Sequence, residues 1–424
     1  MQRWYLRLWY KDLLAEKMKR IFTYFLILAL FFGACTPRQA LFRQNLDYAY
    51  IPATTIAYDY LADKDSLQVF LKFADEGLFK DLPQNQLKLL YTISLSYERP
   101  DIIRRDSVRQ FGKRLRFKNN FAYVDFKLPT AGITLPSVLQ LQIPQHVAED
   151  EYLWLDIPLR RDVLAKKLLL TDANTGLPLF RAYVNTSETF KIKSSAPINS
   201  VQLKQYETDF PAALPPFSLS QKKVSPTLNL IRTSQIPVGE NIKLDQEGLF
   251  VLDAGESSTS IISVANEYPE LTTARELIEP LIYMTSSEER KKLYEATEPK
   301  KALDRFWLDI ANQNQELAKR LIKEYYQRVK EANIFFSSHK DGWLTDRGML
   351  YIILGKPTVV NRRLDAEEWT YINRRQGGAT YKFIFIKKPN TFTQNHYELI
   401  RRPEYEFVWY STVEKWRKGT ILEE

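Results

Sequence analysis

The sequence predicts a mixed fold in which antiparallel β-sandwich modules precede a C-terminal α+β domain. Apolar residues alternate with polar ones through much of residues 67–264, which is typical of half-buried strands. Beyond Tyr268-Pro269 the apolar residues recur at steps of three and four, which is typical of helices. The chain has 424 residues, more than one hydrophobic core usually holds, so we expect two or three domains.

The alternating segments are the expected strands of the β region. They lie at residues 67–73, 87–95, 122–128, 139–143 and 153–159, a spacing that favours an antiparallel sandwich. Asp172–Gly176 separates apolar residues 168–170 from 179–180, which predicts a β-hairpin. A proline-rich stretch at 211–226 predicts a linker or an edge crossover, and strands resume over 242–262. We therefore expect a β-sandwich-like module at 36–150 and a second β-rich module at 151–264.

The remaining residues, 265–424, predict the α+β domain. A short amphipathic helix at 271–278 is closed by Pro280, and Thr285 and Ser286 begin two overlapping capping boxes. The longest helix is expected over 306–336, where apolar residues fall on one face. After it, residues 350–354, 368–372, 381–386 and 405–410 are expected to be strands.

The N-terminus has the features of a signal peptide. Lys17, Lys19 and Arg20 precede the apolar run 21–32, which is too short to span a membrane and ends at Phe32-Gly33-Ala34-Cys35. Met18 makes a conventional start, so residues 1–17 are interpreted as a misassigned extension of the signal segment 1–35. The alternative is an ordinary secretory signal or a short anchor helix with an incidental cysteine.

The ending at Cys35 resembles the lipobox of bacterial lipoproteins, although Phe32 stands where that family usually has an aliphatic residue. The resemblance implies that the thiol is diacylated and becomes residue one. Cys35 is the only cysteine, so no disulfide or cysteine-rich zinc site is available to explain it. Because several acyl chains on one residue hold a protein permanently, we expect a membrane anchor.

The charge gives no sign of a nucleic-acid partner. The whole chain has a net charge of +9, and the residues after position 34 hold 54 basic and 49 acidic residues, a net charge of +5 that is spread evenly. Thr36–Ala40, which follow Cys35, contain no acidic cluster that resembles the surface-export signal of some lipoproteins, so the periplasmic face of the outer membrane is favoured over the cell surface.

The densest motif is the run Lys340–Pro357, which resembles the GWxTD domain. That family's pattern is Gly-Trp-any-Thr-Asp, then Arg-Gly, a segment carrying Tyr, and Gly-any-Pro. The matching residues are Gly342, Trp343, Thr345, Asp346, Arg347, Gly348, Tyr351, Gly355 and Pro357. Phe306-Trp307, Asn333, 368–371 and 383–385 extend the likeness over residues 265–390, whereas Thr358 replaces a frequent acidic residue. The resemblance implies a secreted or lipid-anchored bacterial envelope protein and no particular reaction.

Two interpretations of the motif remain open. As a structural corner, Gly342 turns the chain, Trp343 buries its ring and Thr345 closes a side-chain turn over Arg347-Gly348. As a ligand site, Asp346 and Arg347 form a polar groove beside Trp343. The structural corner is favoured.

The sequence offers little for catalysis, and we expect no cofactor, no metal and no enzyme active site. The three histidines, His146, His339 and His396, are dispersed, and no phosphate-binding loop is found. Ser337–Asp341 holds a hydroxyl, an imidazole and a carboxylate, but sequence neighbours point in different directions. Glu367 and Glu368 are expected on opposite faces of a strand, which disfavours acid–base pairing.

We therefore expect a lipid-anchored structural or protein-interaction component of an envelope assembly for secretion or motility. Its expected partners are a membrane and an envelope protein. The alternative is a glycan-binding or glycan-processing lipoprotein that uses Trp369, Trp409 and Trp416 as a platform, although core packing is favoured for these rings. A third hypothesis is an enzyme with a site at Asp346, Arg347 and His339.

Overall fold

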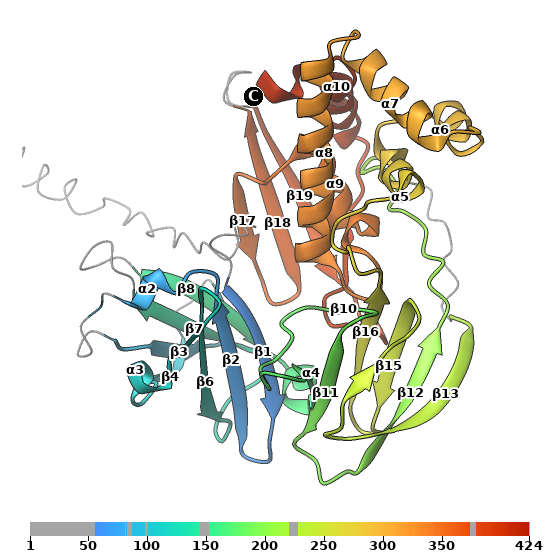
Figure 1. Cartoon of the computed structure of the whole chain (residues 1–424). Coiled ribbons are helices and arrows are strands. Elements are labelled where there is room, and N and C mark those ends of the chain that lie inside the picture. Colours follow the sequence, from blue (N-terminus) through green and yellow to red (C-terminus); the bar gives the residue numbers. More distant parts are fainter. Residues whose placement is uncertain are drawn as a thin grey trace, which may run out of the picture. The chain divides into compact units, whose positions relative to one another are not determined.

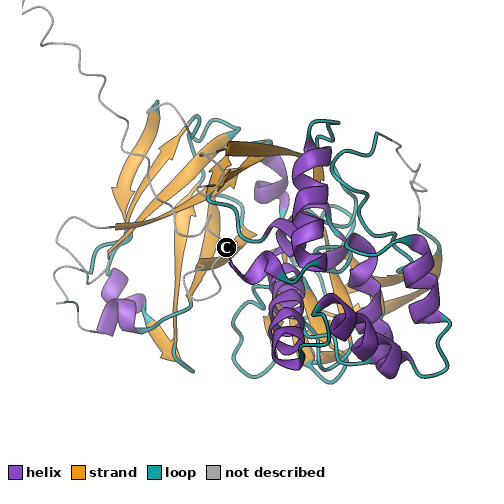
Figure 2. Ribbon diagram, turned by 90° about the horizontal axis from the view of Figure 1, so that it is seen from above, coloured by secondary structure: helices purple, strands orange, loops and turns teal. Residues whose placement is uncertain are grey.

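The computed structural model describes residues 56–80, 82, 87–97, 101–144, 152–219, 228–373 and 379–423 (Figure 1). The expected signal segment and Cys35 lie outside these residues. The fold is mixed, as predicted: antiparallel sheets make up the N-terminal part, and most of the helices belong to the C-terminal domain (Figure 2). No helix in the described ranges is long and apolar enough to cross a membrane.

The first β module contains two four-stranded antiparallel sheets that share one core. The first sheet has the order β1 (Ile56–Ala62), β2 (Ser66–Phe73), β6 (Phe121–Pro129) and β5 (Arg116–Lys118). The second has the order β4 (Ile102–Ser107), β3 (Leu90–Ser94), β7 (Ser137–Pro144) and β8 (Tyr152–Leu159). Short helices α2 (Gly77–Lys80), α3 (Phe111–Arg114) and α4 (Arg161–Ala165) join or follow them. Since β8 is hydrogen-bonded to β7, this sheet continues past the expected boundary at residue 150.

The second β module pairs a five-stranded sheet with a three-stranded one around a separate core. The larger sheet has the order β10 (Tyr183–Asn185), β16 (Ser258–Val264), β15 (Gly248–Asp253), β12 (Ser200–Tyr206) and β13 (Leu230–Pro237). The smaller has the order β14 (Ile242–Lys243), β11 (Thr189–Ser194) and β9 (Leu168–Asp172). All pairs are antiparallel except β10 with β16.

The hairpin expected around residues 172–176 forms, with a shorter second arm than the sequence predicts. The turn forms, since Oδ1 of Asp172 accepts from Thr175 N at 2.7 Å and Gly176 has φ 66°. The second arm is short: Thr171 forms an antiparallel bridge with Pro178, and Leu179 N donates to Leu170 O at 3.1 Å. Phe180, with φ 56°, then takes the chain out of the ladder, and the longer partner of β9 is β11.

The C-terminal domain packs helices around the antiparallel sheet β17 (Val359–Arg362), β18 (Ala366–Asn373), β19 (Ala379–Lys387) and β20 (Tyr397–Leu399). Its helical elements are α5 (Ala274–Ile278), η2 (Glu279–Tyr283), α6 (Ser287–Tyr294), α7 (Pro299–Ile310), α8 (Gln315–Phe336), η3 (Gly342–Leu344), α9 (Asp346–Leu354), α10 (Tyr405–Arg417) and η4 (Thr420–Glu423). Capping boxes at Thr273 with Glu276 and Ser286 with Glu289 begin α5 and α6.

Three sequence predictions for this domain are wrong. The single long helix is two helices, because Asn312 and Gln313 adopt positive φ and Asn314 caps a new start by accepting from Leu317 N at 3.1 Å. Residues 350–354 belong to helix α9, whose apolar run is buried on almost every side and so has no helical periodicity. Residues 405–410 open helix α10, where the buried side chains are Tyr405, Val408, Trp409, Thr412 and Trp416. The six residues 405–410 are too few to show that helical spacing, which becomes clear only over the whole of α10.

The proline-rich stretch connects β12 to β13 by way of the C-terminal domain. Ala212, Ala213 and Phe217 pack against that domain's core, and Pro216 O accepts from Arg402 N at 3.0 Å. The described part of this connection is therefore packed backbone that serves as an edge crossover between neighbouring strands.

Candidate functional site

The GWxTD motif forms a tight corner, residues 342–348, between α8 and α9. Asn333 of α8 is fully buried; its Oδ1 accepts from Trp343 N at 3.1 Å and its Nδ2 donates to Pro269 O at 3.1 Å. Oγ of Ser337 accepts from Gly342 N at 3.0 Å. The end of α8 thus supplies side chains that satisfy the corner's backbone, which a turn buried in this way requires.

The two glycines of the corner are needed for close approach. A Cβ on Gly342 would lie 1.9 Å from Ala332 O, and a Cβ on Gly348 would lie 2.0 Å from Gly342 O. Neither glycine has the positive φ that would indicate a left-handed turn. Glycine is therefore required at position 342, as predicted, but for a different reason than a sharp turn. The backbone at Gly342 lies directly against the backbone at Ala332 and leaves no room for a side chain.

Trp343 and Thr345 act as the structural-corner interpretation expects. Trp343 is 5% exposed, and Tyr283 donates from its hydroxyl to Trp343 O at 2.8 Å. Oγ1 of Thr345 accepts from Gly348 N at 3.0 Å and donates to Gly342 O at 2.7 Å. Thr345 is therefore the N-cap of α9, and this cap is the signal that identifies residues 346–354 as a helix.

Asp346 joins the first turn of α9 to β20. Its Oδ2 accepts from Leu399 N at 2.7 Å, and its Oδ1 pairs with Nη2 of Arg401 at 2.5 Å. The Asp346 side chain is 11% exposed. A carboxylate at a helix N-terminus is also favoured by the helix dipole.

Arg347 reaches into the core, beside β18 and the start of β20. Its Nη1 lies 3.3 Å from Oε2 of Glu367, whose side chain is 1% exposed, and its Nη2 donates to Oδ1 of Asn395 at 2.7 Å. The guanidinium lies 4.3 Å from the centre of the Tyr397 ring. This is a buried, hydrogen-bonded ion pair, and removing either partner would leave a buried charge without its main partner.

Glu367 and Glu368 face opposite sides of β18, as expected. Glu367 is buried and also accepts from Nε1 of Trp369 at 3.1 Å, whereas Glu368 pairs with Lys382 at 3.0 Å. Sequence reasoning did not identify Glu367 and Arg401 as partners of the motif. Glu367 lies 20 residues from Arg347 and Arg401 lies 55 residues from Asp346 along the chain, and no local signal marks such pairing.

The last motif residues fix the exit from α9. The Tyr351 hydroxyl donates to Oε2 of Glu331 at 2.6 Å. Gly355 ends the helix with φ 79°, and its carbonyl accepts from the Tyr371 hydroxyl at 2.9 Å. Pro357 is buried. All nine motif residues therefore lie in one continuous structural unit that joins α8, α9 and the sheet.

The segment Ser337–Asp341 is packed against aromatic rings. The His339 ring lies 5.1 Å from the Phe210 ring and 5.4 Å from the His396 ring, and burial lowers the pKa of His339 to about 3. Burial raises the pKa of Asp341 to about 6. A histidine with so low a pKa is a weak proton acceptor at neutral pH, which argues against the Ser–His–Asp hypothesis.

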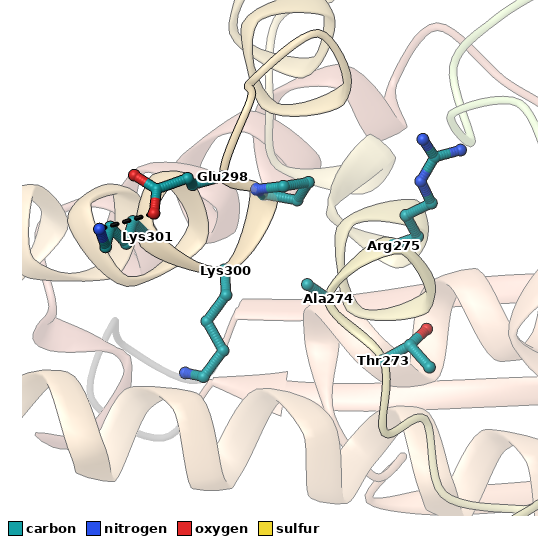
Figure 3. Close-up of a pocket in the computed structure, with 7 residues that line it drawn as sticks. Thr273, Ala274, Arg275, Glu298, Lys300 and Lys301 are labelled. Atoms are coloured by element: carbon teal, nitrogen blue, oxygen red, sulfur yellow. Dashed lines mark ion pairs between the residues drawn. The ribbon is translucent and has the colours of Figure 1, made fainter.

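Two open hollows in the described part of the C-terminal domain are lined by residues outside the motif. One, of about 580 Å³, is bordered by Thr273–Arg275 at the start of α5 and by Glu298–Lys301 at the start of α7 (Figure 3). Its Lys301 pairs with Glu298 at 2.6 Å. A second, of about 550 Å³, is lined by Leu293, Phe306 and Ile310 of α6 and α7, among others. In the described part of the chain, no group of three or more His, Cys, Asp or Glu is placed to hold a metal ion.

Comparison with known families agrees with this architecture. The family model described as the GWxTD domain matches residues 248–418, so the chain contains a GWxTD domain. The match is wider than the likeness noticed in the sequence: it begins at β15 and includes α10. No curated protein matches the chain.

Proposed function

We propose that this protein is an outer-membrane lipoprotein, anchored through Cys35 at the periplasmic face, that works as a non-enzymatic structural or protein-interaction component of an envelope assembly. The observation that supports it best is the use of the motif's own charged groups. Asp346 and Arg347 are the motif side chains best suited to bind a ligand or take part in a reaction. Each is held instead by ion pairs and hydrogen bonds within the domain. The motif thus serves the fold, which favours a scaffold over a reaction.

Exposed apolar side chains provide surfaces for partners. Phe407 and Tyr410 lie one turn apart on α10 and are 70% and 53% exposed. Such side chains are costly in water and are enriched where proteins meet. By contrast, Trp369, Trp409 and Trp416 are at most 3% exposed, so they pack in the core and offer no platform for a sugar.

The test compares the lipidated chain with Cys35→Ser in the native host. Membranes are fractionated, the tagged protein is crosslinked in intact cells, and captured proteins are identified by mass spectrometry. We expect the wild type in the outer-membrane fraction with stoichiometric envelope partners, and the variant released into the periplasm without them. Wild-type protein that is soluble, or that is recovered alone with bound glycan, would contradict the proposal.

A second pair of variants separates an interaction surface from a fold defect. Phe407→Ser removes an exposed ring and should reduce partner recovery at unchanged stability. Its matched control is Glu406→Ser, an exposed neighbour on the same helix. Equal recovery from both variants would show that this face of α10 is not the contact surface.

A further inference from the structure

Strand β13 forms a free edge of the five-stranded sheet, next to β12 (Figure 1). Seven of its eight residues are exposed, including Leu230 at 52% and Ile231 at 56%. Among the strands that the structure describes, none pairs with its outer side. An edge of this kind presents unpaired N–H and C=O groups that another strand can bind.

The alternation of hydrogen bonds between β12 and β13 shows which backbone groups of β13 point outward. Val238 N donates to Asn199 O at 2.9 Å, and Pro237, which lies opposite Ser200, has no N–H to donate. Bonded and non-bonded pairs alternate in an antiparallel ladder. Ser234 and Ile236 therefore direct their backbone groups to β12, while Thr233 and Gln235 direct theirs away from the sheet.

The middle of β13 has few of the features that protect natural edges from pairing. Such edges usually carry lysine, acidic residues, central prolines or bulges. In β13 the only charged residue is Arg232, the proline is the last residue, and the bulge is confined to the start, where Ile231 has no partner in β12. Residues 232–236 thus form a regular edge that is open to a further strand.

We propose that β13 pairs with β13 of a second copy of this chain, antiparallel about a two-fold axis at Thr233. In this register Thr233 faces its own counterpart, Arg232 faces the partner's Ser234, and Leu230 faces the partner's Ile236. No like charges are directly opposed, and the exposed Leu230 side chain lies beside the half-buried Ile236 of the partner strand. A register shifted by two residues would place Pro237 opposite Ile231 and lose an N–H donor on each side, so the first is favoured.

A second copy fits this edge because the strand complements itself. The occupant must offer outward N–H and C=O groups at alternate residues and an apolar side chain opposite Leu230, and β13 supplies both. Pairing would join two five-stranded sheets through an isologous contact, the commonest symmetry of protein dimers. The inference deepens the proposed interaction role on which it rests. Its test uses the purified chain alone, so it can fail while the proposed envelope role stands.

The test measures the mass of the full chain in detergent, with the bound detergent subtracted. We expect a dimer for the wild type. Thr233→Lys and Thr233→Glu each place like charges opposite one another and should weaken the dimer at least tenfold, whereas an equimolar mixture of the two variants should restore it. Gln202→Lys is the matched control: it adds a charge to an exposed position of the neighbouring strand β12, within the sheet, and should leave the dimer intact.

Chemical crosslinking tests the register itself. Thr233→Cys should give a covalent dimer with a short bismaleimide, and Gln202→Cys should not, because the second position lies one strand further from the axis on each side. A monomeric wild type, or a dimer that neither charged variant weakens, would overturn the proposal. The proposal would also be overturned by a monomer that crosslinks through position 233 to a different protein. That outcome would indicate that the edge of β13 pairs with a strand of another protein.

Discussion

The GWxTD corner and strand β13 use their polar groups in opposite ways. In the corner, Asn333, Thr345, Asp346 and Arg347 are bonded to other parts of the same domain. In β13, seven of eight residues are exposed and the outer backbone groups have no strand beside them in the described part of the chain. The most recognisable residues of this protein therefore maintain its fold, while the less distinctive sequence of β13 leaves an exposed edge.

The largest expected effect comes from Gly342→Ala. Its new Cβ would meet the backbone of Ala332, which cannot move without disrupting α8, so we expect a loss of about 3 kcal/mol or more in unfolding free energy. Denaturant unfolding followed by tryptophan fluorescence measures it. Gly112→Ala is the control, because its Cβ would meet only the Leu87 side chain, at 3.2 Å. A stable Gly342→Ala variant would show that the corner tolerates expansion.

Arg347→Met should have the next largest effect. It leaves Glu367 buried without its guanidinium partner, and breaking such pairs costs about 3–5 kcal/mol. Arg362, 3.6 Å from Glu367, should keep the loss near the lower end of that range. The same unfolding measurement tests it, and an unchanged midpoint would indicate that Arg347 is held for ligand binding instead.

Asp346→Asn distinguishes the corner from the enzyme hypothesis. The amide oxygen can still accept from Leu399 N, but the charge attraction to Arg401 is lost, so we expect a loss of about 1–3 kcal/mol. Full stability combined with the loss of a measurable activity would favour a catalytic carboxylate.

His339 should make stability depend on pH. Its pKa is about 3 in the folded protein and about 6.5 when unfolded, so the unfolded chain binds more protons as pH falls and stability decreases. Between pH 7 and pH 5 this one group should cost about 2 kcal/mol. Asp341, with its raised pKa, acts in the opposite direction over the same range. His339→Gln should therefore lose less stability than the wild type across this interval, and equal losses would contradict the assignment.

The smallest effect on stability is expected at the edge strand. Thr233→Lys lies on an exposed position with no packing to lose, so the unfolding free energy should change by no more than about 0.5 kcal/mol. The circular dichroism melting curve of the monomeric variant checks this. A large drop would mean that Thr233 supports the fold rather than an interface.

The sequence could predict those elements whose pattern depends on being half-buried. Strand β6 alternates between buried and more exposed side chains, and the capping box of α6 at Ser286 is a local signal, so these predictions are confirmed. Helix α9 was mistaken for a strand because it is apolar on all sides. The motif residues were identified, but the partners Glu367 and Arg401 were not, since their pairing is made by the tertiary fold.

The central claim, that the motif is a structural corner, is tested most directly by a double-mutant cycle on Arg347 and Glu367. Unfolding free energies are measured for the wild type, Arg347→Met, Glu367→Leu and the double variant. We predict that the double variant recovers most of the stability lost by Arg347→Met, because no buried charge is then left without a partner. If the losses of unfolding free energy were additive, or if the single variants were as stable as the wild type, the claim would be contradicted. Arg347 would then be a candidate for ligand binding.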